Sequence, residues 1–226
     1  MPKGDDERWQ AKQAHYEDEG VVAGYDEARF ARGSGRRSTE RKWRAIRRGL
    51  GPAFDEVGSV LDLPCGTGRF TGRLLDAGKR VVAADRSLPM LRAARGKRAA
   101  GTFVRCDAER LPFAEGSFDL VLSVRFLLHV PKARRAGVLR EMARVSRRWV
   151  VVDVRHRYCL TTAGKRLRAR LAGRAPPSLR SSLAEIDADL GAAGLRLARR
   201  TWLAPGFSEK MLLFCVAVRD QPGSRR

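Results

Sequence analysis

The chain has 226 residues, of which 43% are hydrophobic, and a formal net charge of +21. This length suits one α/β domain with its own core, and no apolar run approaches the roughly 18–20 residues of a membrane span. The charged start, Met1 to Glu7, is unlike a signal peptide, and the four cysteines form no C-x-x-C pair. These features predict a cytoplasmic protein with free thiols and no transmembrane segment.

Two helical patterns precede the first expected strand. Residues 5–19 are mostly charged, and residues 34–50 place apolar side chains on one face and arginines on the other. We expect residues 1–50 to form an N-terminal helical cap and residues 51–226 to form the core. A basic, lid-like insertion is expected at about 155–180.

In the core, strand patterns alternate with helical patterns, which is typical of a parallel sheet with helices on both faces. The expected strands are 60–63, 81–84, 103–106, 118–124, 149–154, 195–203 and 211–218. The expected helices are 70–75, 87–95, 132–146 and 183–190.

The last two expected strands are joined by only seven residues, 204–210. A parallel crossover needs a dozen or more residues, so this link predicts a hairpin and an antiparallel last strand. The predicted fold is therefore a three-layer, Rossmann-like α/β fold with seven mostly parallel strands.

A glycine turn follows the first core strand. Gly66 and Gly68 let backbone N–H groups approach a ligand closely, and the start of the next helix adds partial positive charge. Asp85 comes about 20 residues later, at the end of the next strand, where an acid can accept hydrogen bonds from ribose hydroxyls. This pattern predicts a cofactor that contains a nucleoside.

The segment Asp62-Leu63-Pro64-Cys65-Gly66-Thr67-Gly68 resembles motif I of the class I S-adenosylmethionine-dependent methyltransferases. The similarity continues through Asp85 and through residues 106–113 and 117–123, and it covers about residues 25–154. The chain resembles the branch that contains the ubiquinone- and menaquinone-type enzymes. It departs from the motif at Pro64, which replaces the first glycine and removes one N–H group.

The resemblance implies S-adenosylmethionine as cofactor and S-adenosylhomocysteine as product. Asp107 would then receive the adenine amino group, with the Ala108 backbone beside it. Tyr25 is a candidate cofactor contact, although it could equally anchor the cap, and Arg29 is a candidate for the cofactor carboxylate. The cofactor-binding residues implied are Tyr25, Asp62, Pro64, Gly66, Gly68, Asp85, Arg86, Asp107 and Ala108.

The loop after residues 118–124 should face the transferred methyl group. His129 is a candidate general base there, or a structural histidine that caps the next helix. Arg125 and Phe126 are candidate acceptor contacts, although Arg125 could instead pair with an acid. Asp153 either lines the acceptor pocket or caps the sheet edge.

The leading hypothesis is methyl transfer to a small-molecule or lipid-like acceptor. The alternative is a methyltransferase for RNA or another polyanion, because basic clusters occur at residues 36–48, 132–148 and 155–174. A weak association with polyanions or anionic membranes is expected in either case. A NAD(P)-dependent reductase is disfavoured because no Tyr-x-x-x-Lys pair occurs and the C-terminal hairpin does not fit. A catalytically silent binding module is the remaining class.

Overall fold

The computed structural model describes residues 4–27, 33–98, 100–156, 164, 168–173, 181–204 and 209–218. Within these residues, seven strands form one sheet in the order β3-β2-β1-β4-β5-β7-β6. The strands are β1 (Ser59–Asp62), β2 (Arg80–Asp85), β3 (Thr102–Arg105), β4 (Phe118–Ser123), β5 (Ser146–Arg155), β6 (Leu195–Trp202) and β7 (Lys210–Ala217).

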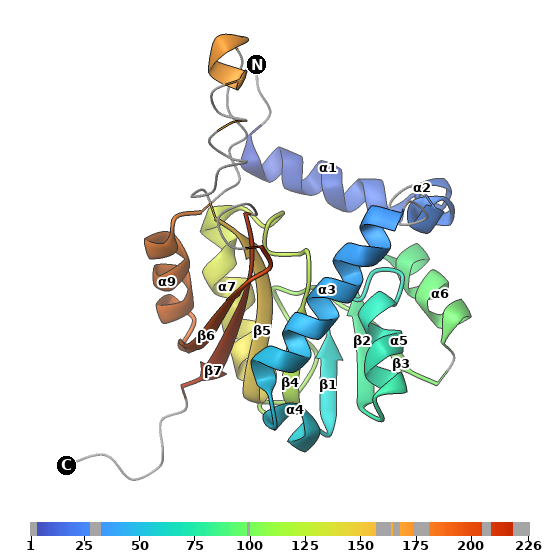
Figure 1. Cartoon of the computed structure of the whole chain (residues 1–226). Helices are drawn as coiled ribbons and strands as arrows, with labels where there is room; N and C mark the ends of the chain where they lie inside the picture. Colours follow the sequence, from blue (N-terminus) through green and yellow to red (C-terminus); the bar gives the residue numbers. More distant parts are fainter. Residues whose placement is uncertain are drawn as a thin grey trace, which may run out of the picture.

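Strand directions follow the expectation from the short C-terminal link. The strands β1 to β5 pair in parallel, whereas β7 lies antiparallel between β5 and β6. This confirms the predicted fold class. All the parallel strands therefore end at one edge of the sheet, which is the upper edge in Figure 1.

Helices cover both faces of the sheet and its upper edge (Figure 1). They are α1 (Asp5–Glu17), α2 (Glu19–Ala23), α3 (Gly33–Leu50), α4 (Ala53–Glu56), α5 (Arg69–Asp76), α6 (Leu88–Lys97), α7 (Lys132–Val145) and α9 (Leu183–Ala192). Among the described helices, none has the length and apolarity needed to cross a membrane.

One face of the sheet is covered by α3 to α6, and α3 runs diagonally across it in Figure 1. Ile46 and Leu50 of α3 are buried against the β-strand side chains of this face. A Cβ atom at Gly49 would lie 2.0 Å from Cζ of Phe214, so α3 rests directly on β7. This packing joins α3 to the core, whereas α1 and α2 lie over the upper edge. The proposed division at residue 50 stays a prediction.

The other face is covered by α7 and α9. Val138, Leu139 and Met142 of α7 and Ile186 and Leu190 of α9 are buried in the same cluster as the inward side chains of β5 and β7. The strand β5 begins at Ser146, before the expected residue 149, next to a register shift in its pairing with β4. Most of the predicted lid at 155–180 lies outside the described residues.

Candidate active site

The glycine turn connects β1 to α5 at the upper edge of the sheet. Gly66 and Gly68 have φ angles of 53° and 77°, which residues with a side chain disfavour. A Cβ at Gly68 would lie 3.0 Å from the Cβ of Ala94 in α6, whereas no atom lies within 4 Å of the corresponding position at Gly66. Gly68 thus lets α5 approach α6, and Gly66 lines an open cleft.

Asp85 ends β2 and lies beside this turn. Its carboxylate accepts hydrogen bonds from the backbone N–H of Gly66 at 2.8 Å and of Ser87 at 3.0 Å. Burial raises the pKa of Asp85 to about 6, although the backbone hydrogen bonds oppose this shift. The side chain also lines the cleft, so the ligand space meets an acid that titrates close to neutral pH.

Asp62 lies beneath the turn rather than in the cleft. It is 2% exposed, and its carboxylate accepts a hydrogen bond from the Thr71 hydroxyl at 2.6 Å. Burial raises its pKa to about 7. Neither Asp62 nor Gly68 lines the cleft, and both help to shape the turn.

The ends of β2 and β3 form the next part of the wall. Asp107 accepts hydrogen bonds from the Glu109 backbone N–H at 2.9 Å and from Nη1 of Arg86 at 3.4 Å. Arg86, Asp107 and Ala108 all line the cleft. Asp85 and Asp107 therefore face the same space, which Glu17 of α1 also lines.

Helix α1 forms a wall that sequence reasoning missed. Trp9, Lys12, Gln13 and Tyr16 line the cleft, and their spacing of i, i+3, i+4 and i+7 puts them on one helical face. This spacing is a readable signal in the sequence, but it is carried by mostly polar side chains. Tyr25 also lines the cleft, with its ring 5.9 Å from that of Tyr16.

Asp26 connects the N-terminal helical cap to the glycine turn through hydrogen bonds and an ion pair. Its carboxylate accepts hydrogen bonds from the Thr67 hydroxyl at 2.8 Å and from Nε of Arg69 at 3.1 Å, and it pairs with Lys97. Burial raises the pKa of Asp26, but the Lys97 and Thr67 hydrogen bonds outweigh it and hold the pKa below its usual value. Arg29, a sequence candidate, lies outside the described residues.

The opposite end of the cleft is made by the segment after β4. Arg125, Phe126 and His129 line it, and the His129 N–H donates to the Phe126 carbonyl at 2.8 Å. Arg125 has a φ of 65° and is the one residue other than glycine with positive φ in the described part of the chain. Its backbone N–H donates to Asp153.

Asp153 is buried away from the cleft and pairs with Lys42 of α3. Both side chains are 5% exposed. Burial lowers the pKa of Lys42, and Asp153 opposes that shift. Asp153 therefore links α3 to the segment of Arg125, which is a role that spacing along the chain could not indicate.

The cleft encloses about 1170 Å³, counted to its open mouth. The structure brings together ten of the fourteen residues singled out from the sequence: Tyr25, Pro64, Gly66, Asp85, Arg86, Asp107, Ala108, Arg125, Phe126 and His129. An open turn, two carboxylates and aromatic side chains suit a nucleoside, so the residues present fit the expected cofactor.

Comparison with known proteins was consistent with this geometry. Residues 60–148 match the family described as "Methyltransferase domain". A demethylmenaquinone methyltransferase of Paenarthrobacter aurescens is 40% identical over 121 residues, covering 51% of this chain and 46% of that protein. A malonyl-[acyl-carrier protein] O-methyltransferase of Pseudescherichia vulneris is 49% identical over 65 residues, covering 29% and 26%. The chain thus spans about half or less of the length of these relatives.

Among solved structures, the magnesium protoporphyrin IX methyltransferase of Synechocystis with bound S-adenosylmethionine superposes with a TM-score of 0.66 at 18% identity. The match covers 92% of this chain and 96% of that one. Residues 60–148 thus resemble a methyltransferase domain, and the fold is that of methyltransferases of known structure. In sequence, part of the chain is similar to demethylmenaquinone methyltransferases.

Proposed function

We propose that this protein transfers a methyl group from S-adenosylmethionine to a small-molecule or lipid-like acceptor by in-line substitution. The observation that carries the proposal is one cleft with two different ends. The glycine turn and Asp85 form one end, and Arg125, Phe126 and His129 form the other. The cofactor supplies a methyl group already activated by a positively charged sulfur, so alignment and exclusion of water can provide roughly 7–11 kcal/mol.

Cofactor binding is assigned to the acids and backbone of the first end. Asp85 would accept hydrogen bonds from ribose hydroxyls, and Asp107 from an adenine amino group beside Ala108. Pro64 and Gly66 would form the floor, and Tyr25 would cover the ligand from the cap. Arg86 completes this wall, and Asp62 and Gly68 would maintain the turn.

Acceptor binding is assigned to the second end. We propose that His129 holds or removes a proton of the acceptor, because it lines the cleft beside Arg125 and Phe126. Phe126 would give an acceptor ring or chain an apolar contact. Relatives named for demethylmenaquinone and malonyl-[acyl-carrier protein] support an acceptor of small-molecule or lipid-like character.

The test is a comparison of cofactors followed by a screen of acceptors. Calorimetry should show binding of S-adenosylmethionine and S-adenosylhomocysteine and much weaker binding of NADH. A tritiated-methyl screen over quinone, lipid and RNA pools should then label a quinone or lipid fraction. Tighter binding of NADH would overturn the cofactor assignment, and labelling of RNA alone would overturn the acceptor class. Binding without labelling of any pool would favour a silent binding module.

A second role, weak association with polyanions, is favoured by one surface. Arg37, Arg41, Arg44 and Arg48 are exposed and follow one another along one side of α3. Nη1 of Arg199 in β6 donates to the Arg48 carbonyl at 3.4 Å, which extends this arginine row onto the sheet. Within this row Arg44 pairs with Glu40 at 3.6 Å. In the second basic cluster Arg134, Arg144, Arg147 and Arg148 are all in ion pairs.

We expect the arginine row to bind a generic RNA and anionic vesicles weakly and to lose both as salt rises. Filter binding and vesicle sedimentation at low and physiological salt would measure this. RNA binding that persists at physiological salt would favour an RNA methyltransferase over the leading proposal.

A further inference from the structure

The turn of residues 126–130, between β4 and α7, carries the acceptor end of the cleft. Phe126 and His129 lie in this turn, and both line the cleft. The His129 N–H donates to the Phe126 carbonyl at 2.8 Å. The Val130 N–H donates to the Leu127 carbonyl at 3.3 Å. Both bonds lie within the turn, so they fix its shape but not its place relative to the neighbouring elements.

Arg135 contacts this turn from α7, the helix that follows it. Its Nε donates to the Val130 carbonyl at 3.0 Å, and its Nη1 donates to the Ser181 hydroxyl. Among the hydrogen bonds of the described residues, the bond from Arg135 is the one that the Val130 carbonyl accepts. Because Val130 is fully buried, removal of the guanidinium would leave a buried carbonyl without a donor.

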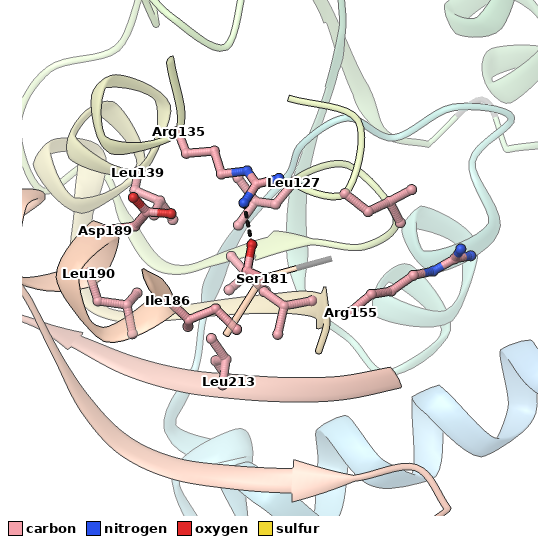
Figure 2. Close-up of a pocket in the computed structure, with 12 residues that line it drawn as sticks. Leu127, Arg135, Leu139, Arg155, Ser181, Ile186, Asp189, Leu190 and Leu213 are labelled. Atoms are coloured by element: carbon pink, nitrogen blue, oxygen red, sulfur yellow. Dashed lines mark hydrogen bonds between the residues drawn. The ribbon is translucent and has the colours of Figure 1, made fainter. Parts of the chain in front are cut away.

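Ser181 connects Arg135 to the end of β5. Its backbone N–H donates to the Arg155 carbonyl at 3.3 Å, and it pairs with His156 in an isolated parallel bridge. Figure 2 shows the Arg135 side chain reaching from α7 to Ser181. One guanidinium group therefore joins three parts of the acceptor side, which are α7, the turn after β4 and the segment beside the end of β5.

The position is unfavourable for a positive charge. Arg135 is 6% exposed, and within the described residues its guanidinium forms no ion pair. Burial lowers its pKa, and the negative charges of Asp189, Glu185 and Asp5 oppose this shift. Arg135 also lies at the end of the first turn of α7, which begins at Lys132, where the helix dipole disfavours a cation.

An apolar side chain would suit the surroundings of Arg135. It lines a slot between α7, α9 and the sheet, whose walls include Leu139, Ile186, Leu190 and Leu213 (Figure 2). A buried charge is costly, and replacing buried ionic groups by apolar side chains of similar volume is often neutral or stabilising. Natural sequences break such rules mainly at functional sites. The directed hydrogen bonds of the guanidinium are the feature that an apolar side chain could not supply.

We propose that Arg135 is a positioning residue for methyl transfer, which holds the turn of Phe126 and His129 at the acceptor end of the cleft, and that Ser181 holds Arg135 in place. This inference rests on the proposed function and adds two residues that do not line the cleft. Because in-line transfer depends on alignment, a small displacement of the turn should slow turnover and leave cofactor binding unchanged.

Nuclear magnetic resonance of the histidine rings tests the geometry without an acceptor. The chain has three histidines, whose signals are assigned with His15→Gln, His129→Gln and His156→Gln. We expect Arg135→Met to shift the His129 signals and the midpoint of their pH titration, because the surroundings of the ring change. His15, exposed on α1, should keep its signals. Unchanged His129 signals in Arg135→Met overturn the proposal.

The rate of methyl transfer tests the role in turnover. Transfer of tritiated methyl groups is measured at saturating S-adenosylmethionine, with the quinone and lipid pools as acceptors. Arg135→Met should lower the initial rate about ten- to a hundredfold, while the S-adenosylmethionine concentration that gives half the maximal rate stays within about twofold. An unchanged rate in Arg135→Met overturns the proposal.

Two further variants separate the geometry of the hydrogen bonds from the charge. Ser181→Ala should lower the rate less than Arg135→Met does, and combining the two should add no further loss, because Ser181 acts through Arg135. Arg135→Lys keeps the charge but lacks the planar fork that bonds both partners, so its rate should also fall below that of the wild type. A wild-type rate in either single variant, or additive losses in the double variant, overturns the proposal.

The matched control is Arg140→Gln, which changes an exposed arginine of the same helix whose Nη2 donates to the Ala192 carbonyl at 3.1 Å. Its rate and its His129 signals should equal those of the wild type, and equal losses there would overturn the proposal. Circular dichroism shows which variants fold. If Arg135→Met does not, Ser181→Ala and Arg135→Lys decide by the same two measurements. Absence of label from every pool in the wild type would overturn the proposed function, whereas the histidine signals would still decide whether Arg135 holds the turn.

Discussion

The two halves of the upper sheet edge carry opposite charge. The ends of β1, β2 and β3 present Asp62, Asp85 and Asp107, whereas the ends of β5 and β7 gather Arg155 and Lys210 with the nearby Lys42 and Arg125. The matched family segment, residues 60–148, covers the acidic half and stops before the end of β5. The match therefore includes the acidic half and Arg125, but not Lys42, Arg155 or Lys210.

The halves also differ in how they hold their buried charge. Asp62 and Asp85 have hydroxyl and backbone donors as partners and no ion pair in the described structure. In the basic half, Lys42 and Asp153 neutralise each other. Ligand affinity in the acidic half should therefore depend on pH. In the basic half, the free energy of unfolding should fall when one charged partner is removed.

His129, between the two halves, should show the largest effect on turnover. His129→Ala is expected to lower kcat by about 10²–10⁴-fold, the range for loss of a general base, while affinity for S-adenosylhomocysteine stays normal. Single-turnover kinetics on the identified acceptor measures this. His15→Ala, an exposed histidine of α1, is the control. Normal kcat in His129→Ala would make this residue structural.

The buried pair of the basic half should show the largest effect on stability. Asp153→Asn keeps an acceptor for the Arg125 N–H but leaves Lys42 without a countercharge, so the free energy of unfolding should fall by about 3–5 kcal/mol. Urea denaturation measures it. The double variant Lys42→Met with Asp153→Asn should recover most of the loss. Equal losses in the single and double variants would contradict a charge effect.

Asp85 should show the largest effect on cofactor affinity. Loss of a charged acceptor costs about 1.5–3 kcal/mol, so Asp85→Ala should weaken S-adenosylhomocysteine binding about ten- to a hundredfold. Calorimetry measures this loss of affinity. The control is Asp76→Ala, which changes an exposed acid that pairs with Arg98. Unchanged affinity in Asp85→Ala would remove this residue from the site.

The smallest expected effect is a pH dependence of S-adenosylhomocysteine affinity. The pKa of Asp85 is raised to about 6, and a ribose hydroxyl donates best to the ionised form. The proton therefore competes with the ligand, and affinity should be constant above pH 7 and fall by up to about tenfold per pH unit below 6. Asp85→Asn should flatten this profile, and a profile that stays steep in this variant would assign the titration to another group.

Much of the acidic half was readable from the sequence because its signals are local. Glycines that need positive φ, acids at strand ends and a seven-residue link between the last strands each act within a short stretch. These features predicted the fold class, which is confirmed, and the sequence singled out ten of the 24 residues that line the cleft.

The features of the site that could not be predicted depend on contacts between distant segments. Lys42 and Asp153 are 111 positions apart in the chain, so their pairing has no sequence signature. Asp62 matches the motif, yet this last residue of β1 is buried beneath the turn. The cleft-facing side of α1 was periodic, but its polarity concealed it, since a wall that touches a polar ligand has no need of an apolar stripe.

Helix α1 lies across the upper edge of the sheet (Figure 1), and Trp9 and Tyr16 line the cleft beneath it. A ligand that fills this cleft is covered by the cap, and the cap is held by partly exposed ion pairs, such as those of Asp26 with Arg69 and of Asp6 with Arg134. We expect salt to weaken these pairs and so to loosen the cap. The residence time of the spent cofactor should then shorten as salt rises, even where its equilibrium affinity is set by Asp85.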